Sequence, residues 1–175
     1  DTFQHTVAVM QRAEDLRRVA RECVEDLAAD NVVYAEIRYA PEQHLRAGLS
    51  LDDVIAAVTA GLREGCAEHD GIEVGQLICA MRQANDAETV ADAALRHRGD
   101  TEPGGIRGFD LAGPEIGFLP SQHRRALEKL AGEFLPVTIH AGEAFGLPSI
   151  WEALQWCGPE IGRREAGRLI KLVED

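Results

Sequence analysis

The feature that most constrains the fold of this chain is a regular alternation of helix-like and strand-like segments. Apolar residues recur at spacings of three, four and seven over Val7–Ala29, which predicts an amphipathic helix. The next run, Val32–Arg38, is apolar and closed by Pro41, which is typical of a short strand. Further strands are expected at Ile72–Ala80, Ile106–Leu111 and Pro136–His140.

Helix signals separate and follow these strands. Ser50 with acidic residues behind it is an N-cap signal for a helix whose apolar face reaches Leu62. Further helices are predicted from Asp86 to about His97, from Ser121 to about Glu133, and from a capping box at Ser149–Glu152 to about Trp156. Gly99–Gly105 is a loop by composition, and Arg168–Val173 has the pattern of a strand.

The alternation predicts βα units and a parallel sheet in a single domain, residues 1–175. Periodicity alone is compatible with a doubly wound sheet and with a (β/α)8 barrel. No glycine-rich phosphate-binding loop of the dinucleotide or P-loop type occurs in the sequence. The chain begins with Asp1 rather than Met, which we interpret as a truncated or processed start.

The composition of the chain argues against nucleic acids and membranes as partners. The net charge is −12, from 18 basic and 30 acidic residues, and a surface this acidic repels nucleic-acid phosphates. No apolar run approaches the roughly 20 residues of a membrane span. The cysteines lie far apart without a C-x-x-C pair, which favours reduced thiols in a cytoplasmic protein; they are Cys23, Cys66, Cys79 and Cys157.

Two strand ends carry residues suited to chemistry, and in parallel α/β folds functional groups gather at the carboxyl ends of strands. The first is Val137–Glu143, where His140 ends the strand and Glu143 lies just beyond it. An imidazole there can bind zinc and a carboxyl group can transfer protons. A hydrogen-bonded histidine and a solvated glutamate are the structural alternative.

The second strand end is Gly108–Glu115. Asp110 lies in an apolar strand and needs a partner there, while Gly113 permits close approach of the backbone to a ligand. Capping of the next turn by Asp110 is the structural alternative. Met81 and Arg82 close another strand and either line a pocket or plug a barrel mouth, and Arg38 is expected to be an ion-pair partner.

The remaining histidines are expected at the surface, in loops or on polar helix faces; they include His44, His69, His97 and His123. No H-x-H, H-x-x-x-H or H-x-E pair occurs, and the C-x-x-C arm of cytidine-type zinc deaminases is absent. By itself, this sequence does not supply a three-ligand zinc centre.

These segments together resemble the adenosine deaminase family, especially its bacterial members. The resemblance is carried in order by His5–Met10, Val32–Pro41, Ile78–Arg82, Gly108–Glu115 and Thr138–Glu143. His-Ala-Gly-Glu alone is moderately specific, and Asp-Leu-Ala-Gly upstream makes the combination specific. The resemblance implies a (β/α)8 barrel that binds one zinc ion and hydrolyses the 6-amino group of adenosine or deoxyadenosine, releasing ammonia.

The resemblance also implies roles for single residues. His140 is implied to be a zinc ligand, and Glu143 the donor of a proton to the purine ring nitrogen beside the attacked carbon. The N–H of Gly113 is implied to hydrogen-bond the purine, with Glu115 nearby and Met81 helping to form the nucleoside pocket. Zinc is implied to activate the attacking water.

The chain departs from the family pattern in its metal site. The H-x-H pair of the first strand, a metal-binding aspartate of the last strand and a histidine after the sixth strand are not found. The chain is therefore expected to cover strands two to five of eight, with a damaged sixth, and to expose open barrel edges that promote instability or self-association. Alternatives are deamination of another 6-aminopurine such as adenine, another amidohydrolase reaction, and a non-catalytic purine-binding or interaction fragment.

Overall fold

A computed structural model describes residues 2–99 and 102–157. The chain forms two compact units that alternate along the sequence. The first unit comprises residues 1–78 and 96–107, and the second comprises residues 79–95 and 108–175. The strand-like segment expected at Arg168–Val173 lies outside the described residues.

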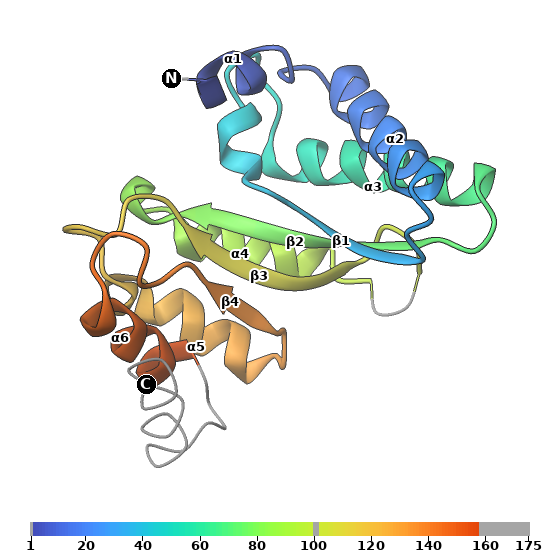
Figure 1. Cartoon of the computed structure of the whole chain (residues 1–175). Helices are drawn as coiled ribbons and strands as arrows, with labels where there is room; N and C mark the ends of the chain where they lie inside the picture. The colour runs from blue at the N-terminus through green and yellow to red at the C-terminus, as the bar shows by residue number, and fades with distance from the viewer. Residues whose placement is uncertain (1, 100–101, 158–175) are drawn as a thin grey trace. The chain divides into compact units, whose positions relative to one another are not determined.

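Strands and helices alternate as the sequence predicted, and the strands form one α/β sheet in the order β1-β2-β3-β4 (Figure 1). Pairing is parallel where β1 meets β2, from Tyr34↔Glu73 to Tyr39↔Ile78, and where β3 meets β4, from Phe109↔Val137 to Leu111↔Ile139. The strands are β1 Tyr34–Tyr39, β2 Glu73–Met81, β3 Ile106–Ala112 and β4 Val137–Ile139. The helices are α1 Thr2–Ala8, α2 Ala13–Ala29, α3 Leu51–Glu68, α4 Ala87–Arg96, α5 Arg124–Gly132 and α6 Leu147–Cys157, with short 3-10 turns η1 Pro41–His44, η2 Arg82–Ala84 and η3 Pro120–His123.

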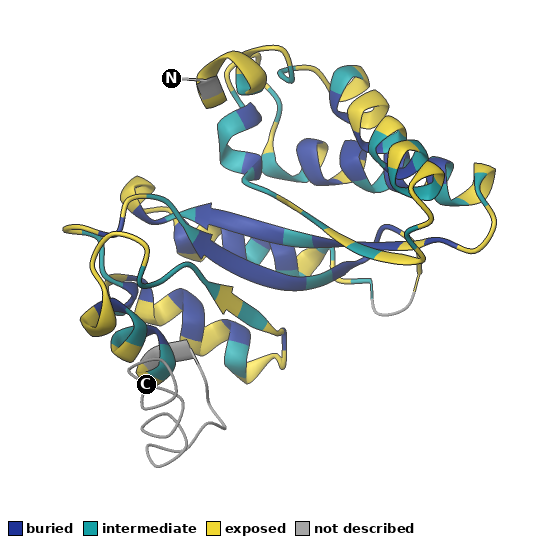
Figure 2. Cartoon of the chain, viewed as in Figure 1, coloured by how far each residue is buried: buried dark blue, intermediate teal, exposed yellow. Residues whose placement is uncertain are grey.

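Burial follows the position of each strand in the sheet. β2 and β3 are buried along most of their length, as strands covered on both faces are, whereas β1 and β4 are largely half-buried or exposed (Figure 2). No helix in the described ranges has the length and apolarity that crossing a membrane requires.

The core of the first unit forms where α2 and α3 pack on each other and on the strands. Its buried residues include Leu16, Val24, Val54, Leu62 and Val74. α3 begins where the sequence predicted, because Ser50 Oγ accepts the N–H of Asp53 at 3.1 Å and Asp53 Oδ2 accepts the N–H of Ser50 at 2.9 Å. This reciprocal pair is a capping box.

The predicted helix over Val7–Ala29 is wrong at its amino end. The chain forms α1 up to Ala8, turns, and starts α2 at Ala13 after the extended residue Arg12. Val9, which fits the helical spacing in the sequence, is 70% exposed and does not belong to the buried stripe of α2. Spacing alone does not reveal such a break.

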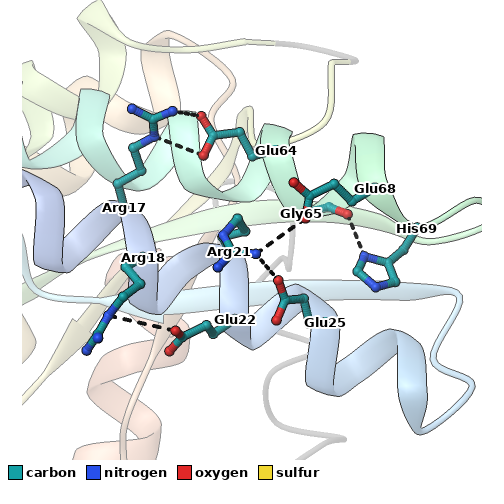
Figure 3. A network of polar contacts seen from close by, with 9 residues as sticks. All are labelled: Arg17, Arg18, Arg21, Glu22, Glu25, Glu64, Gly65, Glu68 and His69. Carbon is teal, nitrogen blue, oxygen red and sulfur yellow. Dashed lines mark hydrogen bonds and ion pairs between the residues drawn. The ribbon is translucent and has the colours of Figure 1, made fainter.

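Ion pairs cover the outer face of α2 and α3 (Figure 3). Arg17 Nε donates to Glu64 Oε2 at 2.9 Å, and Arg21 lies between Glu25 of its own helix and Glu68 of α3. Because these side chains are substantially exposed, solvent screening leaves each pair only a small contribution to stability. The network links the two helices without forming a chemical site.

The capping box predicted at Ser149 is also wrong. α6 begins two residues earlier, at Leu147, and Ser149 lies inside its first turn. The N–H of Ser149 donates to Gly146 O at 3.1 Å, while its hydroxyl is used elsewhere. Pro148 in the second helical position was the better start signal, because proline suits the first turn of a helix.

Two of the histidines expected at the surface are buried. His44 is 4% exposed, and its Nδ1 lies 2.7 Å from Met10 O. His123 is 6% exposed, and burial lowers the pKa of both imidazoles, although backbone hydrogen bonds to Met10 and Arg82 oppose that shift. His69 and His97 are partly buried. Of the cysteines, Cys23 and Cys66 are partly buried and Cys79 is buried, and none of these three forms a disulfide within the described residues.

Candidate functional site

The candidate site lies in the second unit, at the carboxyl ends of β2, β3 and β4. Met81 ends β2, Gly113 and Glu115 follow β3, and His140 follows β4. Backbone hydrogen bonds set the register of the last two strands, since Phe109 N–H donates to Pro136 O at 2.8 Å and His140 N–H donates to Leu111 O at 3.0 Å. The sheet thus places most of the candidate site residues at the carboxyl ends of neighbouring strands, where the sequence analysis expected functional groups.

Asp110 is the buried centre of this group. Its side chain is only 1% exposed; Oδ1 accepts the hydroxyl of Thr138 at 2.7 Å, and Oδ2 lies 3.4 Å from Cys79 Sγ. Nδ1 of His140 lies 3.2 Å from the same Oδ2. The requirement that an aspartate in this strand be paired is therefore met by neighbours on both adjacent strands.

The imidazole of His140 lies beside the carboxylate of Asp110 and remains partly exposed. Asp110 is within ion-pair distance of Nδ1, although the approach lacks the alignment of a hydrogen bond. The side chain of His140 is 29% exposed. A partly exposed imidazole with a buried carboxylate behind one ring nitrogen is the arrangement that orients metal-binding histidines.

Arg82 locks the ends of two strands together. It is fully buried, and its guanidinium donates to His140 O, to Leu111 O at 3.3 Å and to Phe118 O at 3.4 Å. The sequence left two roles open for Arg82, lining a pocket or plugging the mouth of a barrel. The structure supports the second role, because the side chain is buried and donates hydrogen bonds to carbonyl groups at the strand ends. These partners are 29 to 58 residues away in the sequence, so no local pattern identifies them.

Gly113 lies just beyond β3 in a conformation that favours glycine, with φ at +106°. A Cβ at this position would lie 2.3 Å from Gln83 Oε1 and 3.3 Å from Arg82 Cγ. The path of the chain therefore accounts for glycine at this position without any ligand.

Glu115 is buried and turned toward the loop after β4. It is 3% exposed, and its carboxylate accepts the N–H groups of Ala144 and Phe145, the latter at 2.8 Å, and the hydroxyl of Ser149 at 3.0 Å. Burial alone would raise the pKa of Glu115, but these donors outweigh it and lower the pKa to about 2. Glu115 is thus an ionised, fully engaged carboxylate rather than one facing an open pocket.

The other predicted residues are more accessible. Glu143 is exposed in the loop between β4 and α6, and Met81 is partly buried at the end of β2. An imidazole, an exposed carboxyl group and a backbone amide that follow neighbouring strands are groups that hydrolytic enzymes use.

The described residues supply one candidate ligand of a metal site, His140. Within residues 2–99 and 102–157, no group of three or more His, Cys, Asp or Glu side chains is close enough to hold a metal ion. His140 is partly exposed and lies beside a carboxylate, which is compatible with a role as one metal ligand. A zinc site using His140 therefore needs ligands from outside these ranges.

Comparison with protein-family models matches residues 1–163 to the adenosine deaminase family. Over 179 aligned residues the chain is 52% identical to "Adenosine deaminase 1" of Streptomyces coelicolor and 50% identical to an adenosine deaminase of Mycolicibacterium vanbaalenii. The alignments cover 100% of this chain but 43% and 47% of those proteins. The chain thus spans less than half the length of these curated relatives.

Solved structures agree with the fold. An adenine deaminase of Arthrobacter aurescens superposes with a TM-score of 0.78 at 28% identity, covering 90% of this chain and 47% of that one. A zinc-bound amidohydrolase of Burkholderia ambifaria superposes with a TM-score of 0.73 at 29% identity, covering 82% of this chain and 39% of that one. The four-stranded parallel sheet corresponds to part of these enzymes' barrels.

Proposed function

Because the chain belongs to the adenosine deaminase family, we propose that it carries part of the active site for hydrolytic deamination of adenosine or deoxyadenosine. Water adds at the carbon that bears the amino group, that carbon loses ammonia, and the product is inosine or deoxyinosine. The observation that supports this assignment best is the pair formed by His140 and Asp110 at adjacent strand ends.

Each residue has a proposed role in this reaction. Glu143 donates a proton to the ring nitrogen beside the attacked carbon, which makes that carbon more electrophilic. The N–H of Gly113 hydrogen-bonds the purine and Met81 borders the nucleoside. Asp110 holds the imidazole of His140 in one orientation from its Nδ1 side, at 3.2 Å.

His140 is proposed to bind zinc together with ligands from outside the described residues. Zinc, when bound, supplies the Lewis-acid activation of water. The zinc-bound amidohydrolase that the chain resembles at 29% identity supports this choice of metal. The carboxylate of Asp110, 3.2 Å from Nδ1, supports it independently, because a carboxylate beside one ring nitrogen favours a metal ion on the other.

The direct test uses a polypeptide of the length of the curated relatives that carries this segment, called the full-length carrier below. We expect it to convert adenosine to inosine, measured by the change in ultraviolet absorbance, and to release one ammonia for each adenosine consumed. Absence of turnover with any 6-aminopurine, in a zinc-loaded and folded carrier, would contradict the proposal.

A second candidate is deamination of free adenine. The similarity to an adenine deaminase, at a TM-score of 0.78, favours it. Parallel measurement of kcat/KM for adenosine and adenine in the full-length carrier separates the two. We expect adenosine to be preferred, because identity to proteins named adenosine deaminase reaches 52%, and a preference for adenine would reverse the assignment.

A further inference from the structure

The carboxylate of Glu115 joins two loops that follow different strands. Glu115 lies after β3, whereas the hydrogen-bond donors to its carboxylate, among them Ala144, Phe145 and Ser149, come after β4. We call this group the Glu115 clamp. At 3% exposure the carboxylate has little access to water, so these donors provide almost all of its solvation.

The donors place the clamp directly beside Glu143. Two of them are the consecutive peptide N–H groups of Ala144 and Phe145, which immediately follow Glu143 in the chain. A carboxylate that accepts two successive N–H groups fixes the orientation of both peptide planes. The first of these planes includes the carbonyl of Glu143 itself, so the clamp constrains the backbone from which the Glu143 side chain extends.

The clamp is not needed merely to attach helix α6. A separate carboxylate, Glu152, ties α6 to η3, because Oε1 accepts the hydroxyl of Ser121 at 3.0 Å and Oε2 accepts its N–H at 3.3 Å. Only the third donor of the clamp, Ser149, belongs to α6. The contribution specific to Glu115 is therefore the ordering of the loop.

We propose that Glu115 is a positioning residue, which holds the loop Gly142–Phe145 in one conformation and thereby directs the carboxyl group of Glu143. This role differs from the place in substrate binding, near the purine, that the family resemblance implied for Glu115. The effect of Glu115 on catalysis, through Glu143, rests on the proposed function. Its effect on the conformation of the loop does not.

The loop can be tested in the 175-residue chain without any activity. In Glu115→Gln we expect amide hydrogen exchange at Ala144 and Phe145 to accelerate at least about tenfold, because the charge-assisted bonds are lost. Glu152→Gln is the matched control, since it removes the other carboxylate link and should leave these two amides protected. Unchanged protection in Glu115→Gln, or equal loss in both variants, would overturn the proposal.

A measurement on the unmodified chain covers the case in which Glu115→Gln does not fold. Scalar couplings across hydrogen bonds, from the amide nitrogens of Ala144 and Phe145 to the side-chain carboxyl carbon of Glu115, report the clamp directly. Their detection supports it. Their absence, with both amide signals observed and sharp, contradicts it.

The catalytic consequence is read in the full-length carrier. Glu115→Gln should lower kcat roughly 10- to 100-fold, as small misplacements of a catalytic group do, with KM changed by less than about threefold. Added to Glu143→Gln, it should cause no further loss, because the residue through which it acts is already disabled. If the losses of kcat in the two single variants multiply in the double variant, the positioning role is overturned. If the unmodified carrier shows no turnover, the proposed function is refuted. The exchange and coupling measurements on the loop then decide whether the clamp exists.

Discussion

At the scale of single residues, the proposed chemistry of the site depends on one buried carboxylate. Asp110 is buried and contacts Thr138, Cys79 and His140. An uncompensated carboxylate at such a position is costly, which is why the sequence already indicated a partner. Of these three neighbours, the one that matters for the proposed function is His140.

Replacing Asp110 by Asn should therefore weaken zinc binding more than it weakens the fold. The amide can still accept from Thr138 on one atom, but it places an NH2 group or a weaker acceptor beside Nδ1 of His140. Loss of such an outer carboxylate typically lowers metal affinity about 10- to 100-fold. The measurement is chelator competition on the full-length carrier, with circular dichroism as the check of folding.

Thr138→Val is the matched control for Asp110→Asn. It removes the hydroxyl from Oδ1 and leaves the contact of Oδ2 with His140 in place, so zinc affinity should change much less. Equal zinc affinity in Asp110→Asn and the unmodified protein would show that Asp110 does not orient His140.

The types of residue in the sequence were enough to select the candidate functional residues at the strand ends, but not to predict which groups they contact. His140, Asp110 and Gly113 could be selected from the sequence because polar and glycine residues interrupt apolar strands there. The direction of the Glu115 carboxylate could not, since its donors are 29 to 34 residues away. Burial of His44 and His123 was missed for the same reason, because a histidine in a short turn gives no local sign of what covers it.

At the scale of elements, capping chemistry and close approach decide where helices begin and how they pack. The same Ser-x-x-acid pattern occurs at Ser50 and Ser149, but only Ser50 caps a helix. Ser149 Oγ bonds Glu115 and Glu152 bonds Ser121, so tertiary partners have replaced the local pair. The pattern therefore predicts a nearby helix start, whereas the exact residue depends on the contacts of the folded protein.

The contact between α2 and α3 depends on Gly61. A Cβ at this position would lie 2.1 Å from the backbone oxygen of Arg17, which cannot move without displacing α2. Gly61→Ala should lower the free energy of unfolding by about 2 kcal/mol or more, the range of severe overpacking. Urea denaturation followed by circular dichroism measures the effect.

Gly132→Ala provides the comparison for Gly61→Ala. Gly132 ends α5 and a Cβ there meets nothing within 4 Å, so alanine should be neutral or stabilise by up to about 1 kcal/mol through its higher helix propensity. Similar urea midpoints for the two variants would contradict the close approach of α2 and α3.

At the scale of the whole molecule, each compact unit contains one buried histidine that resists protonation. His44 belongs to the first unit and His123 to the second. Burial lowers the pKa of each below its usual 6.5, so the unfolded chain takes up protons before the folded chain does. The resulting stability is present above pH 6.5 and is lost as the pH falls below it.

Urea midpoints should therefore decrease between pH 7.5 and pH 5.5, a range chosen around the ordinary pKa of about 6.5 for histidine. The range excludes Glu115, whose contribution is lost only as the pH falls from 4.5 toward the folded-state pKa of about 2. The double variant His44→Gln/His123→Gln should flatten the profile. A profile as steep as that of the unmodified chain would assign the dependence to other groups.

The α/β architecture and its strands were predictable from the sequence because buried parallel strands and amphipathic helices have distinct apolar patterns. The division into two compact units was not, since β2 and β3 each pass from one unit to the other without a change in pattern. Membership of the family was predictable from five ordered segments, and the match of residues 1–163 to the model of that family confirms it.

The central claim is that the loop and strand end after β4 provide a zinc ligand, His140, and a proton donor, Glu143. The most direct measurement combines zinc content and adenosine turnover in the full-length carrier and two variants. We predict about one zinc per chain in the unmodified carrier and in Glu143→Gln, with turnover lowered roughly 100- to 10,000-fold in the latter, and a loss of tightly bound zinc in His140→Ala. Full zinc content in His140→Ala, or undiminished turnover in Glu143→Gln, would contradict the account.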